Sequence, residues 1–199
     1  MASEVLVGNF QAGDLSGWKY KIFNKKTIYT IQKDNVFGNL LVANSYKSAS
    51  GMYRKVTVDL NKTPCLNWSW KIDNVLSGLD ERTKAGDDYP ARIYVVLSGG
   101  VAIWNTRTIN YVWSSNVNNI GKNWISAYTN KAVMVSLQGG PDNKGALVFQ
   151  KRNIKKDFLK YFKKNTDHID VVALMTDTDN SGQKATTYYG NIFFSDSCQ

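Results

Sequence analysis

Short stretches rich in Val, Ile, Tyr, Trp and Phe recur along the whole chain, and clusters of Gly, Asn, Asp and Ser separate them. This spacing is typical of an all-β sandwich or barrel. We expect strands at residues 5–11, 19–23, 27–33, 40–43, 51–59, 66–72, 91–97, 108–113, 132–137, 146–151, 171–175 and 186–194. The pattern therefore predicts an all-β fold, a two-sheet antiparallel β-sandwich that occupies residues 1–199 as one domain.

Alternation within the strands predicts which side chains meet. Leu66, Trp68, Trp70 and Ile72 share one face of their strand, so we expect the two tryptophans in the core. In the strand at 91–97, alternate aliphatic residues form one face (Ala91, Ile93, Val95 and Leu97), and Arg92 and Tyr94 lie on the other. Arg92 and Tyr94 are therefore predicted to point away from the aliphatic core.

One segment has helical spacing instead. Asn153 is a suitable N-terminal cap, and Ile154, Phe158 and Phe162 recur on one face of a helix over residues 153–164. Five lysines take the remaining positions (Lys155, Lys156, Lys160, Lys163 and Lys164). These lysines either attract an anionic lipid or glycan or form a solvated helix surface.

Composition narrows the class of protein. The chain of 199 residues has 43% apolar and 21% charged residues, close to the average of globular proteins, and no apolar run approaches the roughly 18 residues that span a bilayer. We expect no transmembrane segment. The formal charge of +9 fits an anionic partner such as nucleic acid, an acidic glycan or a lipid surface. Nucleic acid is the weakest of these, because the cations are scattered rather than interleaved with an aromatic platform.

Several kinds of chemistry are disfavoured by residue counts. The two cysteines form no CxxC pair, and the single His168 leaves no two-histidine zinc site and little scope for a Ser-His or Cys-His nucleophile. Residues 1–4 also lack the basic-then-apolar segment of a signal peptide, so we expect either a cytosolic protein or an exported one whose signal is missing from this sequence. The pattern gives no oligomeric state.

Several separated motifs resemble, in order, those of one bacterial exported family, the domain of unknown function number three thousand and forty-seven. The motifs are Gly-Met-Tyr at 51–53, Leu-Asn-Trp-Ser-Trp at 66–70, Gly-Asp-Asp-Tyr-Pro-Ala-Arg-Ile-Tyr-Val at 86–95, Asn-Tyr-Val-Trp at 110–113, Leu-Met-Thr-Asp-Thr-Asp-Asn at 174–180 and Tyr-Tyr-Gly-Asn-Ile at 188–192. The resemblance covers nearly the whole chain. It implies a location in the bacterial envelope, periplasmic or secreted, and brings no established activity.

A more distant resemblance is to jelly-roll carbohydrate-binding modules. It lies in the opening Val-Gly-Asn-Phe-Gln at 7–11 with Gly-Trp at 17–18, and in the closing Tyr-Gly-Asn-Ile-Phe-Phe at 189–194. It implies a jelly roll, galactose-binding-like or concanavalin-like. Those modules often hold a structural calcium with two acidic residues, whose places are taken here by Gln11 and Asn191. Because hard cations need carboxylate oxygens, we do not expect that calcium site in this chain.

A second calcium candidate lies near the end of the chain. Residues 177–182 read Asp-Thr-Asp-Asn-Ser-Gly, so Asp177, Asp179 and Ser181 place oxygens at alternate positions before a turn glycine. The twelfth position is Tyr188 instead of the bidentate glutamate of an EF-hand. A hydrogen-bonded turn and direct ligand contact are the alternatives. No other cofactor is expected.

Paired carboxylates are the other candidate for chemistry. Asp87 and Asp88 precede the strand with Arg92, and if the strand at 171–175 lies beside it, they approach Asp177 or Asp179 across a polar face. Such a pair suits glycoside hydrolysis, as acid and base or nucleophile. The same residues suit sugar binding, or an arginine-carboxylate network that only holds the sheet.

Aromatic residues near these groups suggest a binding face. We expect Tyr94, Tyr111 and Trp113 to present flat rings beside the polar cluster, as in pockets that stack sugar rings. A second core layer is an equally good interpretation of these rings.

The two cysteines favour export. Cys65 begins one predicted strand and Cys198 follows the last, so the two meet if these strands are antiparallel neighbours, as in jelly rolls. We expect a disulfide between them.

Three functions remain open. The first is a non-catalytic envelope module that binds a carbohydrate or glycan through Asp88, Arg92, Tyr94, Tyr111, Trp113, Asp177 and Asp179. The second is a glycan-active hydrolase that uses Asp87 or Asp88 with Asp177 or Asp179. The third is a structural or protein-interaction module. The sequence favours the first, a binding protein without catalysis.

Overall fold

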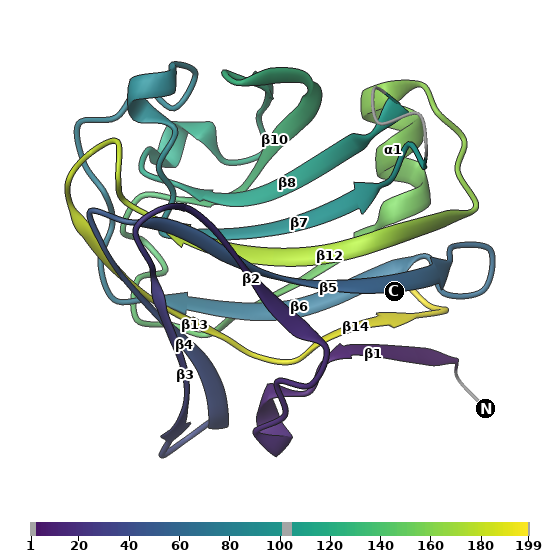
Figure 1. The fold of residues 1–199 in the computed structure, drawn as a ribbon, viewed down its shortest axis with the longest axis horizontal. Helices are drawn as coiled ribbons and strands as arrows, with labels where there is room; N and C mark the ends of the chain where they lie inside the picture. Colours follow the sequence, from purple (N-terminus) through teal and green to yellow (C-terminus); the bar gives the residue numbers. More distant parts are fainter. Residues whose placement is uncertain (1–2, 101–104, 199) are drawn as a thin grey trace.

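Two facing β-sheets make up most of the computed structural model, which describes residues 3–100 and 105–198. The predicted domain span of 1–199 extends past these described residues. Figure 1 shows the two sheets as layers, with one helix at one end. The prediction of an all-β sandwich is confirmed, and the helix predicted at 153–164 is present as α1 (Ile154–Phe162).

In the described part of the chain the first sheet has seven strands. Their order is β1 (Glu4–Gly8), β14 (Ile192–Ser195), β6 (Cys65–Ile72), β13 (Lys184–Tyr189), β4 (Gly38–Tyr46) and β3 (Ile28–Asp34), with β11 (Val148–Asn153) also paired to β6. All of these pairs are antiparallel. We call this layer the lower sheet.

The upper sheet carries the site. Its order is β2 (Trp18–Asn24), β5 (Ala49–Asp59), β12 (His168–Asp177), β7 (Ala91–Leu97), β8 (Arg107–Ser114), β10 (Thr129–Gly139) and β9 (Asn123–Ser126). One pair, β8 with β10, is parallel, a departure from the antiparallel pattern expected from the sequence. Short 3-10 turns lie at Phe10–Ala12 (η1), Lys84–Gly86 (η2) and Val117–Asn119 (η4).

Facing side chains of the two sheets form the core. Trp68 and Trp70 of β6 are 2% and 0% exposed, as predicted, and their rings lie 5.3 Å from Tyr111 and 6.1 Å from Trp113 on β8, centroid to centroid. Burial of such large rings contributes several kcal/mol to the hydrophobic stabilisation, about 1.5–3 kcal/mol for each large apolar side chain. The inner face of the upper sheet is therefore fixed, and its outer face is left for function.

Helix α1 closes one end of the sandwich. The Asn153 side chain accepts a hydrogen bond from the Lys156 amide, which is the predicted N-terminal cap. Ile154 and Phe158 are fully buried in the core, and buried Asp157 accepts hydrogen bonds from Tyr111 at 2.6 Å and from Arg152. The apolar stripe of the helix packs inward and its lysines remain outside.

The predicted disulfide is also present. Cys65 at the start of β6 is bonded to Cys198, with the Cα atoms 5.4 Å apart. Because β14 pairs with β6 and aligns Ser195 with Cys65, the chain end returns to the start of β6. No helix in the described ranges is long and apolar enough to cross a membrane.

Candidate functional site

A groove of about 720 Å³ runs over the outer face of the upper sheet. Small side chains on the central strands contribute to its lining, beside larger and polar ones such as Tyr94 and Asn110 (the small ones are Gly51, Val96, Ala132, Val171 and Ala173). Gly51 is needed here, because a Cβ at this position would lie 2.8 Å from the carbonyl oxygen of Leu174 on β12. Small residues on the floor leave the space that a ligand would fill.

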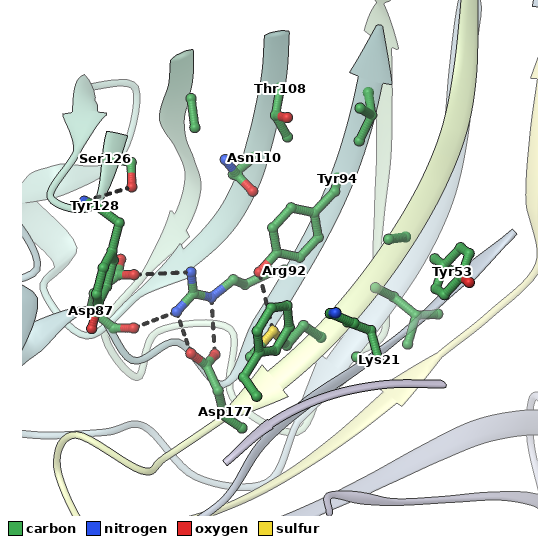
Figure 2. Close-up of a pocket in the computed structure, with 18 of the residues that line it drawn as sticks. Lys21, Tyr53, Asp87, Arg92, Tyr94, Thr108, Asn110, Ser126, Tyr128 and Asp177 are labelled. Atoms are coloured by element: carbon green, nitrogen blue, oxygen red, sulfur yellow. Dashed lines mark hydrogen bonds and ion pairs between the residues drawn. The ribbon is translucent and has the colours of Figure 1, made fainter. Parts of the chain in front are cut away.

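Aromatic side chains stand at both rims of the groove. Phe23 on the edge strand β2 is 65% exposed, and Tyr128, in the turn from β9 to β10, is 56% exposed. These positions belong to opposite edges of the upper sheet. In Figure 2, Lys21 and Tyr53 lie on one side of the groove, and Ser126 and Tyr128 on the other.

Arg92 organises the polar end of the groove (Figure 2). Its Nε donates to Asp177 Oδ1 at 2.9 Å, and its Nη2 donates to Asp177 Oδ2 and to the Asp87 carbonyl oxygen. Nη1 lies 3.5 Å from Asp87 Oδ2, and the guanidinium stacks 4.2 Å from the Tyr89 ring centroid. Arg92 is 5% exposed, so this is a buried, doubly paired cation held by a bidentate carboxylate.

Burial controls the protonation of this cluster. It raises the pKa of Asp177, and the positive charge of Arg92, which donates to both carboxylate oxygens, opposes this rise. Burial likewise raises the pKa of Asp87, again against Arg92. The cause is desolvation, which disfavours the charged form of a carboxyl group.

The other two predicted aspartates hold a turn. Asp88 is fully buried, and its carboxylate accepts the amides of Asn180 at 3.3 Å and Ser181 at 2.6 Å. Asp179 accepts the side-chain amide of Asn24 at 3.3 Å. Met175 of β12 pairs with Arg92 of β7, so the predicted approach of these aspartates around Arg92 is found in the structure.

The two calcium candidates differ in their donor sets. Oxygens of Asp88, Asp177 and Asp179 lie within 4.8 Å of one another, but Arg92 occupies both oxygens of Asp177 and two backbone amides occupy those of Asp88. At the other site, the Gln11 amide donates to Asn191 Oδ1 at 2.8 Å, so a hydrogen bond joins these two residues. Calcium prefers anionic oxygens, so Gln11 and Asn191 do not fit it, whereas the three aspartates are a candidate cation cluster whose oxygens are already largely hydrogen-bonded.

Tyr111 and Trp113 do not lie where the sequence placed them. Both are fully buried between the sheets, and the Trp113 Nε1 donates to the Gly140 carbonyl oxygen at 3.1 Å. Paired residues of adjacent strands share a face, and Arg92 and Tyr94 pair with Val112 and Asn110. Tyr111 and Trp113 therefore belong to the core layer, the alternative interpretation of these rings, and not to the groove.

Sequence reasoning missed several residues that line the groove (Lys21, Phe23, Tyr53, Asn110, Ser126 and Tyr128). Alternation sets Asn110 on the opposite face of its strand from Ile109 and Tyr111, but only the pairing with β7 shows which face lines the groove. No local sequence pattern predicts that the turn with Tyr128 lies beside the groove.

Comparison with known families decides the classification of the chain. Residues 16–193 match the model of the family described as Protein of unknown function (DUF3047). The chain belongs to this family. The resemblance of its separated motifs is thus confirmed for this DUF3047 chain, while a search of curated proteins found no relative.

Solved structures resemble the DUF3047 chain in fold. The family 11 carbohydrate-binding module of cellulosomal cellulase Lic26A-Cel5E of Clostridium thermocellum is 10% identical, with a TM-score of 0.55 over 100% of this chain and 98% of that one. The family 11 module of the same organism in complex with a beta-1,3-1,4-mixed-linked tetrasaccharide is 10% identical, with a TM-score of 0.51 over 96% and 94%. The chain shares the jelly-roll sandwich of these modules.

Proposed function

We propose that the protein is a non-catalytic module that binds a carbohydrate chain in the groove of the upper sheet. The observation that carries the proposal is the pair of exposed rings, Phe23 and Tyr128, on opposite rims of one groove. A flat ring buries the apolar face of a sugar, and polar groups that line the groove accept hydrogen bonds from its hydroxyl groups. A chain laid across the strands would meet both rims.

Unsatisfied acceptors near the floor support a ligand rich in hydroxyl groups. Asp87 Oδ1 and Asn110 Oδ1 are buried and have no hydrogen-bond partner within the described residues. Both residues line the groove. A buried polar atom without a partner costs stability, so these two oxygens favour a ligand that can donate hydrogen bonds to them.

Occupied carboxylates favour binding over hydrolysis. Asp177 has both oxygens on Arg92, and Asp88 has both on backbone amides. A glycosidase needs one carboxyl free to donate a proton and another free to act as base or nucleophile. These two aspartates instead hold the polar end of the groove in shape.

The fold also supports this proposal, and the disulfide supports an exported location. One similar module was solved with a tetrasaccharide, and the shared fold makes an oligosaccharide a reasonable class of ligand. Disulfides persist in oxidising compartments, so the Cys65–Cys198 bond supports a periplasmic or secreted protein.

A glycan array followed by calorimetry tests the groove. We expect selective binding of one class of glycan, and an increase in Kd of about tenfold or more for Phe23→Ala or Tyr128→Ala, because each loses the burial of one ring. Matched controls are Phe149→Ala and Tyr46→Ala, which remove rings that are 76% and 66% exposed and do not line the groove. The controls should bind like wild type.

A blank array with the oxidised protein would reject carbohydrate binding. Equal losses in the rim variants and the control variants would place the binding outside the groove. If wild type hydrolyses a bound glycan and Asp87→Asn does not, the protein is a hydrolase and the proposal of a non-catalytic module is wrong.

A further inference from the structure

Helix α1 presents a basic face at the end of the molecule away from the polar cluster of the groove. The exposed residues of this basic face are Lys156, Leu159, Lys160, Lys163 and Lys164. β12 begins at His168 just after the helix and runs to Asp177, about 30 Å for a strand of this length. A partner on α1 therefore leaves the polar end of the groove open.

Nearby carboxylates do not neutralise this face. Asp157 is bound by Arg152, Asp167 lies 3.0 Å from the Nζ of Lys155, and Asp59 lies 3.9 Å from Lys62. Lys156, Lys160, Lys163 and Lys164 have no ion-pair partner within 4.0 Å in the part of the chain that the structure describes. Four positive charges thus lie on the last two turns of α1 and the two residues that follow it.

Two of these lysines, Lys156 and Lys163, occupy positions that are unfavourable to the helix. Lys156 lies in the first turn, where the helix dipole favours negative charge, whereas Lys160 lies in the last turn, where the dipole favours positive charge. Lys156 and Lys160 also have the four-residue spacing at which like charges on a helix repel. Lys163 has a positive φ of 54°, in the left-handed region that a glycine adopts at least cost. Residues that break local rules together are a sign of function.

We propose that the basic face of α1 docks the protein on an anionic lipid surface. A lysine cluster alone suits any polyanion, but Leu159, 52% exposed, lies among these lysines. A membrane accommodates both features, since the lysines contact lipid phosphates while the leucine enters the headgroup region. A soluble acidic polymer has no apolar region in which Leu159 could be buried. The proposal is independent of what the groove binds.

Vesicle co-sedimentation tests the docking. We expect the oxidised protein to bind vesicles of phosphatidylcholine mixed with phosphatidylglycerol, to ignore pure phosphatidylcholine, and to dissociate as salt is raised. Because each lysine near the surface contributes about 1 kcal/mol, Lys160→Gln with Lys164→Gln should weaken binding about 30-fold. This variant also loses a like-charge pair, so the helix should remain folded. Leu159→Ser should weaken binding without a change of charge.

The matched control is Lys122→Gln with Lys144→Gln, which lowers the net charge equally at exposed positions outside α1. Binding retained by the control and lost by the helix variant supports the docking. Absence of vesicle binding by wild type at low salt, or equal losses in both double variants, overturns it. If wild type and Leu159→Ser bind vesicles and dextran sulfate alike, the face serves an acidic polymer and the lipid assignment is wrong.

Discussion

Arg92 is the residue on which the polar end of the groove depends. It is almost fully buried, and its donors are divided between Asp177, Asp87 and a backbone carbonyl. A buried ion pair gains little over an apolar pair, but removing one partner leaves the other charge buried and uncompensated. Arg92 is therefore a structural requirement for the groove even if a ligand also touches it.

The Arg92→Ala substitution should destabilise the protein and lower its free energy of unfolding by about 3–5 kcal/mol. Urea denaturation of the variant and of wild type measures this loss. Lys21→Ala is the control, because it removes an exposed cation from the same groove and should change stability by no more than about 0.5 kcal/mol. A loss under about 1 kcal/mol for Arg92→Ala would contradict a buried, doubly paired arginine.

Alternation predicted the orientation of some residues at this site and not of others, for a physical reason. It placed Arg92 and Tyr94 outside the core, because the aliphatic residues of the same strand define the inward face. It could not place Tyr111 and Trp113, because the choice between groove and core depends on the register of β8 against β7. Register is a property of two strands, and neither strand contains it alone.

The connection between β6 and β7, residues 73–90, is the element that brings Asp87 and Asp88 to the groove. Glu81 anchors it, with 2% of its surface exposed. Its carboxylate accepts hydrogen bonds from the Ser114 hydroxyl and the Ser115 amide, both at 2.6 Å, and from Asn119 at 3.3 Å. One side chain thus ties a long connection to the end of β8.

This anchor should make stability depend on pH. Burial raises the pKa of Glu81 above 4.5, and the hydrogen bonds from Ser114, Ser115 and Asn119 only partly oppose it. A folded state with a raised carboxyl pKa keeps a proton that the unfolded chain releases. Its contribution to stability is therefore present below about pH 4.5 and is lost as the pH rises through the raised pKa.

Comparison with Glu81→Gln isolates this contribution. The free energy of unfolding of wild type minus that of the variant should shrink as the pH is raised from about 4.5 to 7, because glutamine does not titrate. Asp142→Asn, a change at an exposed carboxylate, serves as the control and should show no comparable trend. A difference that grows with pH would mean that the folded state favours the charged form of Glu81.

At the scale of the whole molecule, the short-range pattern predicted the layers better than their connections. Most expected strands are present, but the one at 186–194 is divided into β13 and β14 at Gly190 and Asn191, and β9 was not expected. The parallel pairing of β8 with β10 could not be predicted from alternation, because side chains alternate in the same way in parallel and antiparallel strands. The rim that carries Tyr128 depends on that pairing, so the groove could not be outlined from sequence.

The disulfide joins the C-terminal segment of the chain to a central strand of the lower sheet. It connects Cys198, three residues beyond β14, to the start of β6, the strand that pairs with β11, β13 and β14. The bond encloses a chain segment with a sequence separation of 133 residues. A crosslink across so long a segment restricts the unfolded chain strongly, and native disulfides of this kind contribute about 2–4 kcal/mol.

Cys65→Ala with Cys198→Ala should therefore lower the free energy of unfolding by about 2–4 kcal/mol, with some further loss from the cavity at fully buried Cys65. Chemical denaturation with and without a reductant separates the two causes. The reductant should destabilise wild type and leave the double variant unchanged, because only wild type has a bond to break. Uptake of two thiol labels by denatured, unreduced wild type would show that the bond is absent. The stabilisation would then have to come from packing at the start of β6 alone.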